Sequence, residues 1–328
     1  MKIISLFSGA GGLDLGFEQA GFEIVFANEF DSHIWATYEK NHKCPLDHSD
    51  IRTLDINKIP DADGLIGGPP CQSWSAAGSQ KGIADPRGQL FVDYINILKV
   101  KQPKFFICEN VPGILFAKNA TALNMFLNSF QEAGYKVIVK KINAATVGAP
   151  QDRERVIFFG IREDLNIEPT LDLPQVAPVT LAAAIADLQT SAVAAAANNT
   201  ANKNLTIPNH EYFTGGFSSM YMSRNRVRDW SEQGYTVQAS GRQCQLHPQA
   251  PKMEKIGTDK CRFVVGQEHL YRRLTVRECA RLQGFPDDFI FIYDKVDDGY
   301  KMVGNAVPVQ LAYALAENVK QLLGESNE

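Results

Sequence analysis

The sequence has no long apolar segment, no closely paired cysteines and no excess of positive charge. None of its apolar runs approaches the roughly 18 to 20 residues of a membrane-spanning helix, and residues 3–7 are too few for a signal peptide. The six cysteines are scattered over 328 residues without a Cys-x-x-Cys pair, which argues against a zinc finger or a disulfide framework. We therefore expect a cytoplasmic protein without a metal site, in which any functional cysteine acts alone.

The chain as a whole has a small negative net charge, but one segment of it is positively charged. The net charge is -4 and the isoelectric point about 5.9, whereas proteins that neutralise many phosphates are usually basic. Residues 203–281, however, hold thirteen lysines and arginines against seven aspartates and glutamates, a net charge of +6 that leaves -10 for the rest. A basic segment in an acidic chain is compatible with binding double-stranded DNA.

Segment periodicity predicts the fold class. Up to about residue 161, short β-rich segments alternate with longer amphipathic ones, which predicts βαβ units and a Rossmann-like, mostly parallel α/β sheet flanked by helices. This rhythm ends near Asn166, and helical periodicity returns at 309–323. The length favours two domains, which we place at residues 1–175 with 300–328, and at residues 176–299. The expected strands are 3–7, 23–27, 64–67, 104–108, 136–142 and 156–161, and the expected helices 13–20 and 32–41.

A glycine-rich turn, residues 7–12, separates the first predicted strand from the first predicted helix. Its glycines allow a ligand to approach the backbone beside the helix N-terminus, although such a turn can equally be a tight connection only. The third glycine of the dinucleotide fingerprint is replaced by Asp14, so a phosphate-binding Rossmann turn is disfavoured. Glu29 and Phe30 end the second strand, where an acid can hold ribose hydroxyls and a ring can stack on a nucleobase.

Four chemically active side chains follow successive predicted strands. Two prolines precede Cys71 and direct it away from the sheet, and Glu109 closes the next strand as either a surface acid or a proton donor. Because Glu29 and Asp50 also follow strands, all four lie at the edge where open α/β sheets bind ligands. The set indicates a nucleoside-containing cofactor, a nucleophilic cysteine and an acid.

Six ordered motifs resemble those of the bacterial DNA cytosine-C5 methyltransferases, and the resemblance runs from residue 5 to about 312. They are residues 7–12, 68–72, 109–111, 151–155, 273–278 and 304–308. The resemblance implies S-adenosylmethionine as cofactor. It places Phe7, Gly9, Gly11 and Gly12 around the methionine part, Glu29 on the ribose, Phe30 and Asp50 at the adenine, and Asn305 closing the site. Ser8, Leu13, Ile51, Pro70 and Ala306 complete the implied cofactor site.

The resemblance also implies a mechanism. Carbon 5 of cytosine is a weak nucleophile, so the ring is first activated by addition of the Cys71 thiolate at carbon 6. Glu109 contacts N3 and the exocyclic amine, and Arg153 and Arg155 complete the catalytic set, with Arg155 holding the ring oxygen or a nearby phosphate. The target base must be flipped out of the duplex, and residues 72–88 have the composition of a loop that could close over it.

The smaller domain carries target recognition in the family that the sequence resembles. Alternate spacing of Arg224, Arg226 and Arg228 predicts that they share one face of a strand, where each could read guanine or contact phosphate. The region around residues 238–251 resembles that of methylases acting on GGCC, which implies methylation of the internal cytosine and pairing with a restriction endonuclease. We expect a monomer. Its remaining implied DNA contacts are Arg242, Gln72 and Ser75.

Three alternatives remain at the level of the sequence. A tRNA cytosine methyltransferase would share the catalytic architecture, and a catalytically silent DNA-binding regulator would share the fold. The intact Cys71, Glu109 and Arg155 speak against the regulator. A Cys-His hydrolase is disfavoured because none of the six histidines lies in a comparable motif.

Overall fold

The computed structural model describes residues 1–70 and 86–324, which form two compact units. Unit 1 comprises Met1–Asn143, Glu154–Gln175 and the chain from Leu311, and unit 2 comprises Ala144–Arg153 and Val176–Gln310. The expected domains differ from these units at residues 144–153, which group with unit 2, and at the return to unit 1, which comes at 311. The division into a catalytic and a recognition domain stays a prediction.

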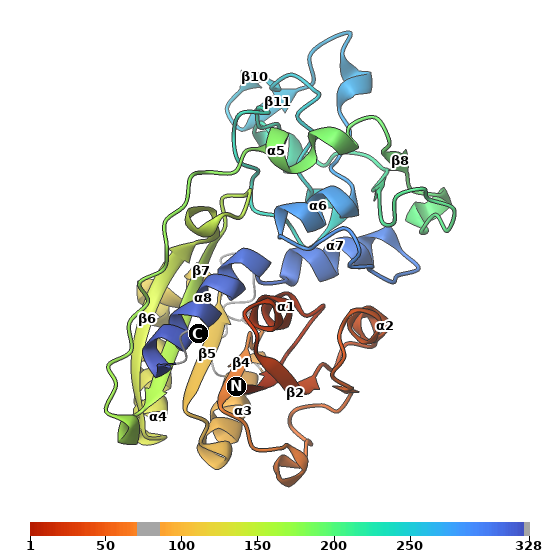
Figure 1. Ribbon diagram of the computed structural model, residues 1–328. Coiled ribbons are helices and arrows are strands. Elements are labelled where there is room, and N and C mark those ends of the chain that lie inside the picture. Colours follow the sequence, from red (N-terminus) through yellow and green to blue (C-terminus); the bar gives the residue numbers. More distant parts are fainter. Residues whose placement is uncertain (71–85, 325–328) are drawn as a thin grey trace. The chain divides into compact units, whose positions relative to one another are not determined.

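Unit 1 is built on a seven-stranded sheet with the order β3-β2-β1-β4-β5-β7-β6. Figure 1 labels β2, β4, β5, β6 and β7 of this sheet. The first five strands are parallel and β7 runs antiparallel to both neighbours, so the predicted mostly parallel sheet is confirmed. β1 lies between β2 and β4, which makes it the point where the strand order reverses and where such sheets bind ligands. The strands are β1 (Lys2–Leu6), β2 (Glu23–Asn28), β3 (Leu46–Asp47), β4 (Gly64–Gly67), β5 (Phe105–Asn110), β6 (Tyr135–Asn143) and β7 (Glu154–Arg162).

Helices cover both faces of this sheet because successive residues of its central strands point to opposite sides. On β5, Phe106 packs against Phe130 of α4 at 4.3 Å between ring centroids, whereas Phe105 faces Phe17 of α1 at 6.5 Å. Among the described residues, no helix is long and apolar enough to cross a membrane. The helices of unit 1 are α1 (Gly12–Gln19), α2 (Ser32–Asn41), α3 (Pro86–Lys101), α4 (Ala120–Glu132) and α8 (Val309–Leu323), which begins at the end of unit 2.

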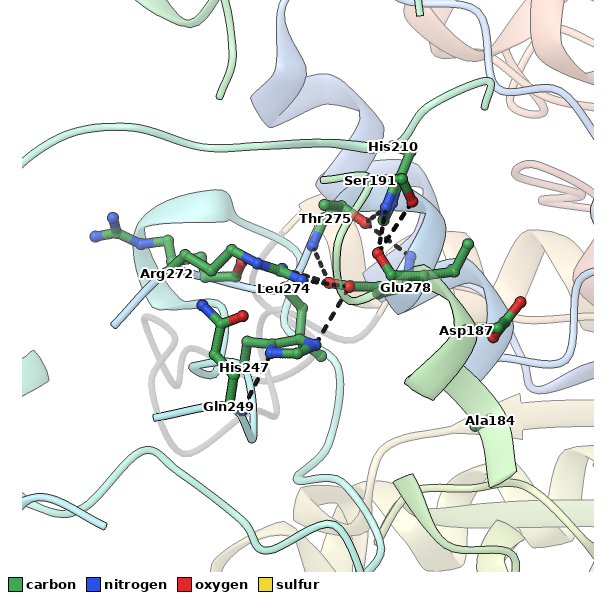
Figure 2. Close-up of polar contacts among 12 residues, drawn as sticks. Ala184, Asp187, Ser191, His210, His247, Gln249, Arg272, Leu274, Thr275 and Glu278 are labelled. Atoms are coloured by element: carbon green, nitrogen blue, oxygen red, sulfur yellow. Dashed lines mark hydrogen bonds and ion pairs between the residues drawn. The ribbon is translucent and has the colours of Figure 1, made fainter. Parts of the chain in front are cut away.

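Unit 2 contains only short helices and strands, and buried polar side chains hold it together. The Glu278 carboxylate is fully buried and accepts hydrogen bonds from both terminal nitrogens of Arg272, at 2.8 and 2.7 Å (Figure 2). It also forms a capping box with Thr275 at the start of α6, and its Oε1 lies 3.5 Å from Nε2 of His247. The elements are α5 (Leu181–Ile185), β8 (Val193–Ala194), β9 (Glu211–Tyr212), β10 (Glu254–Gly257), β11 (Lys260–Arg262), α6 (Val276–Leu282) and α7 (Val296–Asn305).

The buried His247 should make the stability of the protein depend on pH. Burial lowers the pKa of this histidine from 6.5 to about 4, and the charge of Glu278 opposes the shift only in part. Between these values the unfolded chain binds a proton that the folded chain does not, so the free energy of unfolding should fall as the pH falls from 6.5 to 4. His247→Asn keeps an acceptor for the Gln249 amide but does not titrate, so it should flatten this dependence.

Urea unfolding measured between pH 7.5 and 4.5 checks the expectation. The matched control is the exposed His269→Asn, whose pH dependence should follow that of the unmodified protein. If the free energy of unfolding changed equally with pH in His247→Asn and in the unmodified protein, His247 would not be the responsible group.

Candidate active site

The turn between β1 and α1 adopts a conformation that few side chains tolerate. Phe7, Gly9 and Gly11 all have positive φ angles, of 55°, 55° and 85°. The Ser8 amide donates to the carbonyl of Asn28 at 3.1 Å, which fixes the turn to the end of β2, and Gly11 caps the N-terminus of α1. The predicted glycine turn therefore lies at the carboxyl edge of the sheet, at the position where the strand order reverses.

Glu29 binds this turn to the start of α2. Its Oε2 accepts from the amide of Gly9 at 3.0 Å, and its Oε1 accepts from the amide of Asp31 at 2.7 Å. Burial raises the pKa of Glu29 although these bonds oppose the shift. The neighbouring Phe30 ring is 64% exposed. A buried acid beside an open aromatic face suits a ribose and a nucleobase.

The other predicted cofactor residues of unit 1 have different environments. Asp50 lies three residues after β3, and its carboxylate pairs with the guanidinium of Arg52, which lowers the pKa of Asp50. The side chains of Ser8, Leu13 and Ile51 are buried, and Pro70 is half-buried beyond the end of β4.

Glu109 and Arg155 form an ion pair at the same edge of the sheet. Asn110 of β5 pairs with Val156 of β7, so the neighbouring Glu109 and Arg155 come from adjacent strands. Nε of Arg155 lies 2.6 Å from Oε1 of Glu109, and each side chain is only 12% exposed. A carboxylate and a guanidinium in such a sheltered pair have little freedom to move, so each side chain is held in one orientation.

Glu109 also lies against the backbone that leads to Cys71. A Cβ added at Gly68 would lie 3.0 Å from Oε2 of Glu109, so this glycine makes room for the carboxylate. Cys71, Gln72 and Ser75 themselves lie outside the described residues, as does the predicted closing loop at 72–88 up to Pro86, where α3 begins.

The thiols in the described part of the chain are structural in character. Cys44, Cys108, Cys244, Cys261 and Cys279 are all buried and free. Burial raises the pKa of Cys108 well above its usual value, which makes its thiolate scarce at neutral pH. Across residues 1–70 and 86–324, no three His, Cys, Asp or Glu side chains gather as metal ligands.

Arg153 is completely buried within unit 2. Its guanidinium donates to the carbonyl oxygens of Val237, Gly304 and Ala306, at 3.0, 2.6 and 3.1 Å. These bonds fix the backbone on both sides of Asn305, whose side chain is exposed at the end of α7. The geometry therefore favours a positioning role for Arg153 over the direct catalytic role that the motif implied.

The recognition arginines do not share one face of a strand, so that expectation is wrong. Residues 224–228 form no strand and contain only one isolated bridge, between Val227 and Leu246. The side-chain amide of Asn225 donates to the carbonyl of Val227 and accepts from its N–H, so these two main-chain groups are not available to a partner strand. Arg226 donates to the carbonyl of Tyr221. Arg228 pairs with Asp152 and Glu232, whereas Arg224 and Arg242 are exposed.

The sequence assigned no structural role to two buried residues beneath the turn of residues 7–12, Asp14 and His42. Asp14 is fully buried and accepts hydrogen bonds from Ser5 and Tyr38, each at 2.6 Å. A signal for it was present, because Asp14 stands next to Leu13 and three residues before Phe17 on the apolar side of α1. His42 had no comparable signal, since it follows the last residue of α2.

Most of the chain matches one protein family. Residues 1–321 match the C-5 cytosine-specific DNA methylases. The chain belongs to this family. The methylase is 55% identical over 335 residues to the Type II methyltransferase M.FnuDI of Fusobacterium nucleatum, covering 100% of the chain and 96% of the relative. It is 56% identical over 331 residues to the Type II methyltransferase M.NgoPII of Neisseria gonorrhoeae, covering 98% and 96%.

A solved structure agrees with this assignment. The methylase superimposes on the crystal structure of a candidate DNA modification methyltransferase encoded within an Escherichia coli prophage, with a TM-score of 0.75, 25% identity and 99% coverage of both chains. The predicted enzyme class, a DNA cytosine-C5 methyltransferase, is thereby confirmed, and the Cys-His hydrolase is excluded.

Proposed function

We propose that the methylase transfers a methyl group from S-adenosylmethionine to carbon 5 of the internal cytosine of GGCC in duplex DNA, and so protects DNA from a cognate restriction endonuclease. The observation that carries this proposal is the Glu109–Arg155 pair beside the segment leading to Cys71, on the sheet edge that also holds the turn of residues 7–12. The relatives' Type II names support the restriction-modification role. We further propose a monomer acting in the cytoplasm.

The residues at the end of β2 fit the proposed cofactor. Glu29 can accept ribose hydroxyls with the lone pairs that its two main-chain donors leave, and the exposed ring of Phe30 can lie against the adenine. Gly9, where an added Cβ would meet no atom within 4 Å, leaves the backbone of the turn open to the methionine part. Bound there, S-adenosylmethionine would supply an electrophilic methyl group on its sulfonium.

The protein's own residues would activate the cytosine. The Cys71 thiolate forms a bond to carbon 6, which moves electron density to carbon 5 and makes that atom nucleophilic. Glu109 holds N3 and the exocyclic amine, and Arg155 keeps Glu109 in place and can contact the ring oxygen. After methylation, carbon 5 gives its proton to water, the electrons of that C–H bond form the C5–C6 double bond, and Cys71 leaves carbon 6 as the free thiolate.

DNA contacts are proposed on the open arginines of unit 2. Arg224 and Arg242 are exposed, so their guanidinium groups can reach a base edge or a phosphate. Arg226 and Arg228 are partly committed to Tyr221 and to Asp152 and Glu232, and we propose that they support the neighbouring segment as well as the DNA. Gln72 and Ser75 remain proposed contacts from the sequence.

A methyl-transfer assay with defined substrates tests the proposal. A duplex with a single GGCC site should accept tritiated methyl groups from S-adenosylmethionine, whereas the same duplex with a pre-methylated internal cytosine should not. Treated plasmid should then resist an endonuclease that cuts GGCC. Methylation at a different site would overturn the GGCC assignment and keep the enzyme class, and methylation of tRNA with none of duplex DNA would overturn the proposed substrate.

A further inference from the structure

A buried histidine lies directly beneath the proposed cofactor turn. The His42 side chain has no exposed surface, and its ring stacks on Tyr38 of α2 at 4.3 Å between centroids. A Cβ added at Gly11 would lie 2.0 Å from Nε2 of His42, so only glycine at position 11 leaves room for the imidazole. The buried position of the His42 ring therefore requires glycine at position 11 of the turn.

Both ring nitrogens of His42 face acceptors. Nδ1 lies 2.9 Å from Oε2 of Glu18, and Nε2 lies 3.3 Å from the carbonyl oxygen of Ala10 inside the turn. A carbonyl oxygen and a carboxylate both require a donor, so the geometry selects the imidazolium form, which carries a proton on each nitrogen. The charged ring thus connects α1 to the main chain of the turn.

A second chain of hydrogen bonds reaches the turn from the same buried layer. Oγ of Ser8 lies 2.9 Å from Oγ of Ser5, and Ser5 donates to Asp14, which also accepts from the hydroxyl of Tyr38. Because the Tyr38 ring stacks on His42, the two chains meet there and support the turn at residues 8, 10 and 11.

We propose that His42 is a positioning residue that holds the turn of residues 7–12 in the conformation that binds the methionine part of S-adenosylmethionine. This inference rests on the proposed cofactor. His42 does not contact the target base or the reacting methyl group in this proposal, because its ring lies below the turn. Its loss should therefore weaken cofactor binding and leave the chemical step and DNA binding unchanged.

The charge of His42 gives the proposal a distinctive pH dependence. Burial alone would lower the pKa of His42, but the hydrogen bond to Glu18 and the carboxylates of Asp14 and Glu18 outweigh it and raise the pKa. The remaining titratable neighbours in this layer are Tyr38 and Cys44, whose pKa values are raised by burial, so both stay neutral near pH 7. Cofactor binding should thus weaken as the pH rises and His42 loses its proton.

Two amide substitutions distinguish the contact of His42 with Glu18 from its contact with Ala10. His42→Asn keeps a donor near Nδ1 for Glu18 but cannot reach Ala10, and should raise both KM and Kd for S-adenosylmethionine about tenfold. His42→Gln keeps a donor near Nε2 for Ala10 and should raise them only about threefold. In both variants kcat and the KM for DNA should change less than about twofold, as in the control Lys40→Gln on the exposed side of α2. Unchanged cofactor binding, or a lower kcat at an unchanged KM, would overturn the proposal.

Glu18→Gln provides a second test that does not require removal of the buried ring. The glutamine oxygen can still accept from Nδ1, but the charge that stabilises the imidazolium is gone. The pH at which the Kd for S-adenosylmethionine begins to increase should therefore be lower than in the unmodified protein, and the cofactor's own titration cancels in this comparison. Coincident profiles would overturn the proposal, whereas failure of the unmodified protein to bind S-adenosylmethionine would count against the proposed function instead.

Discussion

The Cys71→Ser variant should transfer no measurable methyl group, with a loss of at least about 10⁴-fold in kcat, since removal of a catalytic nucleophile costs up to about 10⁶ in other enzymes. A serine hydroxyl is protonated near pH 7, so, unlike a thiolate, it must lose its proton to a base before it can attack carbon 6. The measurement is single-turnover transfer of a tritiated methyl group to a GGCC duplex.

Binding of DNA separates this chemical defect from misfolding. Cys71→Ser should bind the GGCC duplex within about threefold of the unmodified protein, since the thiol is needed for addition to carbon 6 and for no phosphate or guanine contact. The matched control is Cys108→Ser, because Cys108 is a buried thiol of β5. This variant should have a lower free energy of unfolding but should still transfer methyl groups when folded. Turnover at the normal rate by Cys71→Ser would refute the covalent mechanism.

The parallel part of the fold was predictable because its strands are short apolar runs separated by amphipathic helices. The predicted helices at 32–41 and 309–323 have the observed bounds of α2 and α8. The antiparallel course of β7 was not predictable, because residues 136–142 and 156–161 read as ordinary strands whatever their direction. Direction depends on the connection between them, which in the structure is a short segment belonging to unit 2 and not a crossover helix.

The positions of site residues were predictable where a motif fixes the backbone. The hydrogen-bond partners of long side chains were not predictable. The turn of residues 7–12 and the placement of Glu29 and Glu109 at strand ends follow from glycine and strand patterns. Arg153 and Arg155 stand two residues apart in one motif, yet one is buried in main-chain bonds and the other pairs with Glu109. Likewise, Arg226 bonds the carbonyl of Tyr221 five residues earlier, and Arg228 pairs with the distant Asp152, which alternate spacing cannot reveal.

Glu109→Gln should reduce kcat by about 10²- to 10⁴-fold, the usual contribution of a positioned acid or base. Glutamine fills the same volume, but it carries no charge for Arg155 and cannot hold a proton for N3 of the cytosine. The measurement is again single-turnover methyl transfer, with the KM for S-adenosylmethionine expected to remain within about twofold, because Glu29 and not Glu109 lies beside the cofactor turn. A near-normal rate would show that Glu109 has no catalytic role.

A double substitution distinguishes this catalytic role from the structural role of the ion pair. Arg155→Gln leaves the sheltered Glu109 carboxylate without its cation, which should lower the free energy of unfolding by about 2 to 3 kcal/mol. Adding Glu109→Gln removes that uncompensated charge, so the double variant should recover most of the stability and none of the activity. Recovery of activity together with stability would mean that the pair acts only by holding β5 against β7, and that the acid in the reaction comes from elsewhere.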